Sequence, residues 1–153
     1  MLEIYVDADS CPVKDEVYRV AYRYGLQVRV VANQSMQVPK EDAFQLVLVG
    51  DRFDEADDWI AEHTGEGDIV VTGDFLLAAR CLEAGSRVVG PRGRVFEDAT
   101  IGEALAAREA QQFMREMGIQ EGGPPPFQER DRSRFLQRLD ELVVAVRRSQ
   151  GIS

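Results

Sequence analysis

The hydrophobic pattern of the first 90 residues consists of short continuous apolar runs separated by longer amphipathic stretches. The apolar runs at residues 2–6, 27–32, 45–49, 69–72 and 86–89 are rich in β-branched residues, which favours strands. They show no strict polar alternation, as is typical of strands that are covered on both faces. The sequence therefore predicts five strands in a mainly parallel sheet.

Between these runs the apolar residues recur at helical spacing. A first helix is predicted after Pro12 and ends at Gly25, and two further helices are predicted over residues 55–64 and 75–83. Strands that alternate with helices specify a three-layer α/β sandwich with a parallel sheet. The expected strand order is 3-2-1-4-5.

The pattern changes after Gly90. Residues 91–94 have the composition of a turn, and a fourth helix is predicted from about residue 100 to residue 117. Residues 119–128 contain GGPPP, which cannot be helical, so this range is predicted to be a connector. Residues 129–149 form the last predicted helix, whose apolar stripe consists of Phe135, Leu136, Leu139, Leu142, Val143 and Val146.

The length of 153 residues suits one domain with a sizeable core. We expect a single domain over residues 1–153, in which residues 1–118 form the α/β core. The apolar stripe of the last helix indicates that it docks on this core.

Acidic residues follow the predicted strands. Asp7 and Asp9 come directly after the first strand, and Asp74 follows the fourth. In the expected order these two strands are neighbours at the reversal point, where α/β folds place their ligands. Carboxylates gathered there repel one another unless a cation lies between them, and oxygen ligands suit a hard divalent ion. The pattern predicts a metal site, and with it phosphate chemistry.

A third acidic cluster, at residues 54–58, follows the third strand. Helical spacing directs Asp57 or Asp58 toward the same edge of the sheet. Each acid also has a purely structural interpretation, because acids in a first helical turn are favoured by the helix dipole and Asp74 can cap the helix that follows it. Thr72 lies two residues before Asp74, and its hydroxyl is placed to orient a carboxylate or a water.

Three more residues are candidates for substrate contacts at this edge. Asn33 ends the second strand, while Arg92 and Arg94 follow the fifth strand and are suited to phosphate. Cys11, near a helix start, has no visible partner base and is interpreted as a packed residue. No basic segment interleaved with aromatic residues appears along the chain, so sequence-specific RNA reading is not expected.

Charge and composition narrow the function further. The net charge of −9 argues against a protein that coats nucleic acid by electrostatics alone. Residues 1–76 have a net charge of −10 and residues 77–153 a net charge of +1, so the second half is the part suited to meet a polyanion. Two cysteines do not form a disulfide framework, and there is no secretory signal and no apolar run long enough for a membrane span. A cytoplasmic location without membrane contact is expected.

Residues 6–13 (VDADSCPV) closely resemble the opening signature of the bacterial YaiI/YqxD family. The similarity continues at residues 31–34 (VANQ), 53–57 (FDEAD), 68–74 (DIVVTGD), 91–93 (PRG) and 122–125 (GGPP). This family is regarded as PIN-like, and PIN-like domains are typically Mg²⁺- or Mn²⁺-dependent ribonucleases with an acidic site on a parallel sheet. The resemblance implies a PIN-like fold and a nuclease that uses Mg²⁺ or Mn²⁺.

The resemblance also implies roles for individual acids. Asp7 matches the first-strand acid, Asp74 the acid after the fourth strand, and Asp57 the acid on the intervening helix. These three are the expected metal ligands and, together with Asp9, the expected catalytic residues. Thr72 and Asp58 are expected to lie next to these acids and orient them without binding the metal ion directly. The leading hypothesis is a metal-dependent phosphodiesterase with nucleic acid, in particular RNA, as substrate.

Two other readings stay open. The first is a non-catalytic module that binds a metal ion or RNA and keeps the carboxylates without activating a water. The second is a phosphatase of the haloacid-dehalogenase type, in which Asp7 is the nucleophile. The second requires a late lysine, whereas the two lysines, Lys14 and Lys40, both lie early in the chain. The sequence does not indicate the oligomeric state.

Overall fold

The computed structural model describes residues 2–52, 54–119 and 125–151. Within these ranges the chain forms a six-stranded sheet in the order β3-β2-β1-β4-β5-β6, in which the first five strands are parallel and β6 is antiparallel to β5. The α/β class and the order of the first five strands are therefore confirmed. The strands are β1 (Glu3–Asp7), β2 (Gln27–Ala32), β3 (Phe44–Leu48), β4 (Ile69–Val71), β5 (Arg87–Val89) and β6 (Val95–Phe96).

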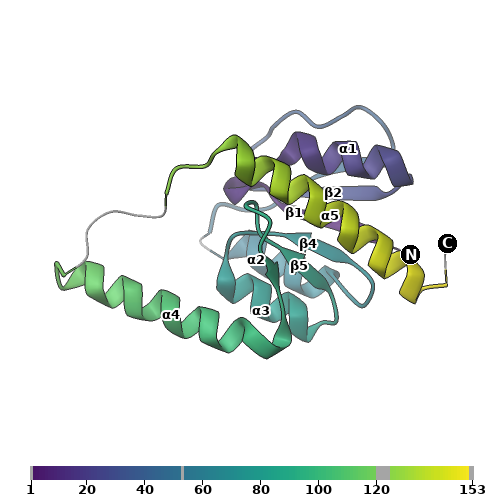
Figure 1. The fold of residues 1–153 in the computed structure, drawn as a ribbon. Helices are drawn as coiled ribbons and strands as arrows, with labels where there is room; N and C mark the ends of the chain where they lie inside the picture. Colours follow the sequence, from purple (N-terminus) through teal and green to yellow (C-terminus); the bar gives the residue numbers. More distant parts are fainter. Residues whose placement is uncertain (1, 53, 120–124, 152–153) are drawn as a thin grey trace.

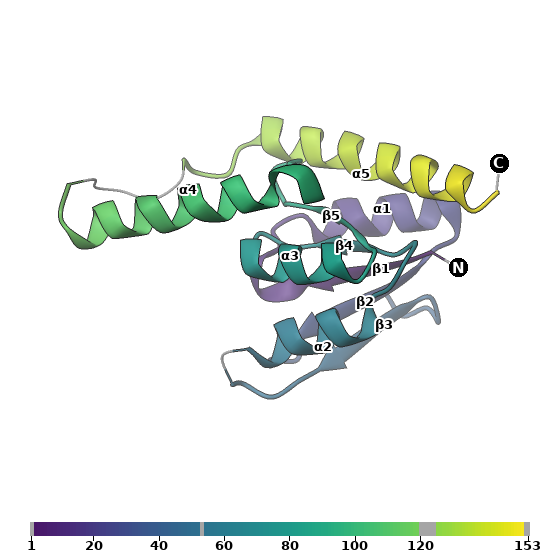
Figure 2. The ribbon, with the colours of Figure 1, turned by 90° about the horizontal axis from the view of Figure 1, so that it is seen from below.

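Helices cover both faces of the sheet (Figures 1 and 2). The five α-helices of the described ranges begin and end within two residues of the predicted bounds. A short 3₁₀ turn, η1 (Ala8–Ser10), separates β1 from the first of them. The helices are α1 (Lys14–Tyr24), α2 (Glu55–His63), α3 (Phe75–Glu83), α4 (Asp98–Glu116) and α5 (Glu129–Ser149).

The core lies in two layers, one on each face of the sheet. One layer joins sheet residues such as Val6 and Val30 to Val17 of α1 and Phe135 of α5. The other joins Tyr5, Val31, Val70 and Val88 to apolar side chains of α2 and α3, namely Ile60, Leu77, Ala78 and Cys81. Successive strand residues enter opposite layers, which is why the strands are apolar without alternation.

The sixth strand was not predicted, because the sequence after Gly90 was read as a turn alone. The backbone N–H of Gly90 donates to the carbonyl of Arg94 at 2.7 Å, and this bond turns the segment into a hairpin with β6 as its return strand. Gly93 has a positive φ of 91°, and a Cβ there would lie 2.7 Å from Cγ of Arg134. The turn therefore needs glycine for its backbone and for its close contact with α5.

The last helix packs on the domain, as its apolar stripe predicted. Phe135, Leu139 and Val143 are fully buried against α1 and the sheet. Gln128 and Asp131 form a capping box at the start of α5. Residues 120–124 of the predicted connector lie outside the described residues, so the Gly122–Gly123–Pro124 part of that prediction is not tested. The helix α4 extends well beyond the sheet (Figure 1).

Candidate acidic site at the carboxyl edge of the sheet

The site is organised around the buried side chain of Thr72. Asp7 is the last residue of β1, which pairs with β4, and Thr72 follows the last residue of β4. The Thr72 hydroxyl donates to Oδ2 of Asp7 at 2.9 Å and accepts from the backbone N–H of Asp74 at 3.0 Å. Thr72 is completely buried and Asp7 nearly so. One hydroxyl therefore holds the Asp7 carboxylate beside the backbone of Asp74, which is the orienting role that the sequence predicted for Thr72.

Asp74 is the N-cap of α3. Its Oδ1 accepts from the backbone N–H groups of Leu76 and Leu77 at 2.9 and 3.1 Å, so the structural interpretation of this residue is correct. Within the described residues, Oδ2 of Asp74 forms no hydrogen bond. Because one oxygen serves the helix, capping and participation in an acidic site are compatible for this side chain.

Asp57 completes the cluster from the first turn of α2, where it is half-buried. Burial, and after it the negative charges of Asp74 and Asp7, together raise the pKa of Asp57 to about 6, while the positive charge of Arg80 acts in the opposite direction. The three predicted metal ligands thus come from three different elements and act on one another electrostatically.

Asp58 points to a different partner. Its Oδ1 lies 2.8 Å from a guanidinium nitrogen of Arg80 on α3, and this ion pair joins α2 to α3. Arg80 was missed by sequence reasoning, although it is the positive charge that moderates Asp57. No local signal identifies it, because only the packing of α2 against α3 brings residues 58 and 80 together.

Asp9 and Asn33 lie at the same edge but are exposed. Asp9 is in the 3₁₀ turn after β1, and Asn33 follows the end of β2. No hydrogen bond among the described residues joins either side chain to Asp7, Asp57 or Asp74. The structure therefore places both beside the cluster without assembling them into it.

The two predicted phosphate-binding arginines differ in their surroundings. The Arg92 guanidinium donates to the carbonyl oxygens of Pro125 and Pro126, and lies 3.3 Å from Oδ2 of Asp131. Arg92 thereby holds the start of α5. The Arg94 guanidinium instead lies over the rings of Phe75 and Phe96, at 5.2 and 5.4 Å from their centres.

The cysteine near the site is not an activated nucleophile. Cys11 is buried, and desolvation raises the pKa of its thiol to about 11. The interpretation of Cys11 as a packed residue is consistent with this surrounding.

The acidic cluster suits a divalent cation that keeps most of its bound waters. In the part of the chain that the structure describes, no group of three or more His, Cys, Asp or Glu side chains is placed to hold a metal ion. Mg²⁺, however, is commonly bound through one or two carboxylates and keeps several waters. Oδ2 of Asp74, which accepts no hydrogen bond from a described residue, and the raised pKa of Asp57 suit that mode of binding and not a closed three-ligand site.

The fold and the clustered acids define an α/β protein with an acidic site at the carboxyl edge of a parallel sheet. The model of the family described as uncharacterized BCR, YaiI/YqxD family matches residues 5–145. The chain belongs to this family, as the sequence motifs predicted.

Curated relatives are similar over nearly the whole chain. The UPF0178 protein of Rhodospirillum centenum is 53% identical over 154 residues, which cover 98% of this chain and 100% of that protein. The UPF0178 proteins of Sphingopyxis alaskensis and Azorhizobium caulinodans are 52% and 49% identical, over 95% and 97% of this chain and 95% and 93% of their own. No solved structure matches the chain. None of the described helices is both long and apolar enough to cross a membrane.

Proposed function

We propose that this protein is a divalent-metal-dependent phosphodiesterase that cleaves nucleic acid, with RNA as the expected substrate and Mg²⁺ or Mn²⁺ as the cofactor. The observation that carries the proposal is that three acids from three elements influence one another: Thr72 links the Asp7 carboxylate to the backbone N–H of Asp74, and the charges of Asp74 and Asp7 raise the pKa of Asp57. A cation would offset the repulsion between these acids, and the reversal point of a parallel sheet is where α/β folds bind ligands.

The side chains divide the work in this proposal. Asp7 is fixed by Thr72, so its carboxylate is oriented before any ligand arrives. Asp74 keeps one oxygen on α3 and offers the other to the site. Asp57 contributes the third charge, and Asp9 assists at the exposed rim. A bound divalent cation would supply an activated water and neutralise charge on the phosphoryl oxygens.

Cleavage assays with a matched control test the proposal. Single-stranded RNA and DNA of equal length are incubated with Mn²⁺, Mg²⁺ or a chelator, using the wild type, Asp7→Asn and Asp42→Asn. Asp42 is an exposed acid before β3, at the opposite end of the strands, so its loss removes the same charge away from the site. We expect Mn²⁺-dependent cleavage by the wild type and Asp42→Asn, and its loss in Asp7→Asn.

The competing function is a module that binds a cation or RNA without catalysis, and the absence of a three-ligand group among the described residues favours it. Binding of RNA without cleavage by the wild type under every metal condition would support the module and overturn the nuclease. Cleavage that is equal in the wild type and Asp7→Asn would show that the activity does not use this site.

A further inference from the structure

A groove runs beside the acidic site under α4. Three adjoining cavities of about 440, 450 and 460 Å³ make it up, and Arg108 lines all of them. One of these cavities is lined by Gly73 and Asp74, and another, which Gly73 also lines, reaches Phe127. We name this feature the α4 groove and define it by Asp74, Phe75, Arg94, Arg108, Gln111 and Phe127.

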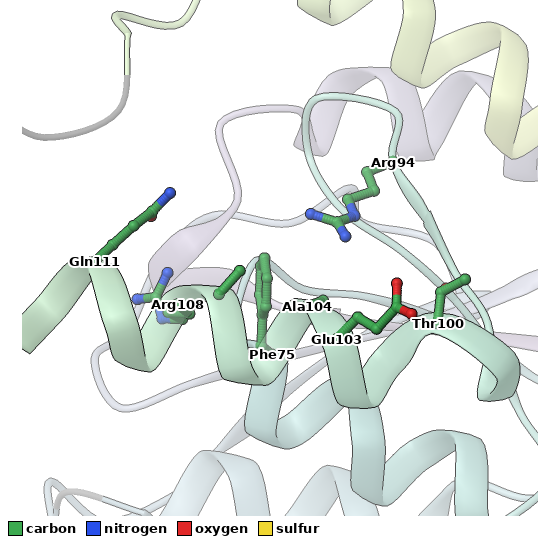
Figure 3. A pocket seen from close by; sticks show the side chains of 8 residues that line it. Phe75, Arg94, Thr100, Glu103, Ala104, Arg108 and Gln111 are labelled. Carbon is green, nitrogen blue, oxygen red and sulfur yellow. The ribbon is translucent and has the colours of Figure 1, made fainter.

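Two arginines face each other across an aromatic ring in the α4 groove. The guanidinium carbons of Arg94 and Arg108 lie 5.2 and 5.3 Å from the centre of the Phe75 ring. Figure 3 shows Phe75 between Arg108, which comes from α4, and Arg94, which comes from the hairpin turn before β6. The fold thus assembles a basic and aromatic surface that is not visible along the sequence.

These two arginines differ from their neighbours in their ion pairing within the described part of the chain. Arg80 and Arg92 are paired with Asp58 and Asp131. Among the described residues neither Arg94 nor Arg108 forms an ion pair, although Glu103 lines a cavity with both arginines and Glu109 lines another with Arg108. In a chain with a net charge of −9, two guanidinium groups on one ring, neither in an ion pair with a described residue, mark a place where an external anion would relieve their repulsion.

The position of the groove indicates the kind of anion. Arg108 lines the same cavity as Asp74, so the positively charged groove adjoins the acidic site. A ligand that extends from the proposed metal site into the groove would therefore need more than one negatively charged group. Exposed arginines beside aromatic rings are typical of surfaces that bind single strands, because guanidinium groups contact phosphates and rings stack with bases. A mononucleotide or free phosphate would fill only part of a groove of this extent.

We infer that the α4 groove binds the phosphate backbone of a single-stranded nucleic acid, with Arg94 and Arg108 contacting phosphates outside the acidic site. The identity of the ligand as nucleic acid rests on the proposed function. The groove would align the strand so that a neighbouring phosphate reaches Asp7, Asp57 and Asp74.

Binding measured without metal separates this inference from the proposed catalysis. The anisotropy of a labelled twelve-nucleotide RNA is followed in chelator-containing buffer at several salt concentrations, with wild type, Arg94→Gln, Arg108→Gln and the double variant. Arg115→Gln is the matched control, because Arg115 is also exposed on α4 but lines none of these cavities. Melting temperatures establish that each variant is folded.

We expect each groove variant to weaken binding several-fold and to reduce the salt slope by about one, as for the loss of one phosphate contact. The double variant should lose about tenfold or more, and Arg115→Gln should bind within about twofold of wild type. We also expect unlabelled RNA to displace the labelled RNA at a far lower concentration than inorganic phosphate does.

Three results would overturn the inference. These are no measurable binding by wild type, equal binding by wild type and the double variant, and a loss in Arg115→Gln as large as in the groove variants. Failure of the nuclease proposal looks different, since RNA would then bind through Arg94 and Arg108 but remain intact when Mn²⁺ is added. Cleavage of RNA at the wild-type rate by the double variant would contradict binding in the α4 groove, but it would leave the proposed nuclease activity unaffected.

Discussion

At the scale of single residues, the acidic site is defined by how each carboxylate is held. Asp7 is oriented by Thr72, Asp74 is divided between capping and the site, and Asp57 is the acid whose ionisation is opposed by burial and by the other two. Positions after strands in the sequence pointed to Asp7, Asp74 and Thr72, and the resemblance to the family singled out Asp57. Helical spacing alone could not separate Asp57 from Asp58, because the difference between them depends on Arg80 from another helix.

The Asp57→Asn variant should be more stable than the wild type at pH 7.5 in chelator. The folded-state pKa of about 6 lies above the ordinary value of 3.8, so stability falls as pH rises through this interval and ionised Asp57 is destabilising above it. Since the side chain is only half-buried, a gain of up to about 1 kcal/mol is reasonable, which corresponds to roughly 2–4 °C in melting temperature.

Thermal unfolding at two pH values checks this. At pH 4 Asp57 is mostly protonated in the folded state, and the gain should shrink toward zero. The control Asp42→Asn should show no such dependence. A gain that is the same at both pH values, or a loss at pH 7.5, would show that repulsion at Asp57 is not what destabilises the site.

The Thr72→Val variant should lose about 1–3 kcal/mol of unfolding free energy, because it leaves the buried Asp7 and the N–H of Asp74 without their shared partner. Thr72→Ser keeps the hydroxyl and should retain the hydrogen bonds, at the cost of one methyl group. Urea unfolding of the two variants decides the matter. If Ser and Val at position 72 were equally destabilising, the hydroxyl would have no orienting role.

At the scale of elements, most strands and helices follow from local pattern. Buried parallel strands need continuous apolar runs, and the glycine at residue 25 ends α1 with a left-handed C-cap. The strand β6 could not be predicted, because two residues carry too little periodicity and, among the described strands, it pairs with β5 alone across a tight turn. The start of α5 depends on Arg92 of that same turn, which the sequence suggested as a substrate contact.

The N-terminus of α3 allows capping and metal binding to be separated. Asp74→Ala should lower the free energy of unfolding by about 1 kcal/mol, since the backbone N–H groups of Leu76 and Leu77 lose their acceptor. Asp74→Asn retains a good N-cap, so its stability in chelator should match or exceed that of wild type, while its Mn²⁺ affinity falls. Thermal unfolding with and without Mn²⁺ measures both quantities. If Mn²⁺ stabilised Asp74→Asn as strongly as it stabilises the wild type, Asp74 would have a capping role and no role in metal binding.

Docking of α5 on the core predicts one cooperative unit. Phe135 is fully buried between α5, α1 and the sheet, so Phe135→Ala should cost about 3–5 kcal/mol in a single unfolding transition. Gln137→Ala on the exposed face of α5 should change stability by no more than about 0.5 kcal/mol. Urea unfolding followed by two spectroscopic probes provides the comparison. Two separate transitions in the wild type would contradict a single domain.

At the scale of the whole molecule, an acidic site and a groove with two arginines lie next to each other. Asp7, Asp57 and Asp74 of the first half lie at the carboxyl edge of the sheet, and Arg94 and Arg108 of the second half, which form no ion pair among the described residues, lie in the α4 groove next to them. The charge asymmetry between the halves was visible in the sequence. The meeting of Phe75, Arg94 and Arg108 was not, because these residues lie far apart in the chain and only the packing of α4 and the hairpin beside α3 joins them.

The central claim is that the carboxylates around Thr72 form a site for a divalent cation, and calorimetric titration of Mn²⁺ at pH 7.5 tests it most directly. Wild type and Asp42→Asn should bind Mn²⁺ with the same affinity, and Asp7→Asn should bind at least about tenfold more weakly, a difference of about 1.4 kcal/mol. Equal Mn²⁺ affinity in the wild type and Asp7→Asn, or no binding by the wild type, would contradict the account.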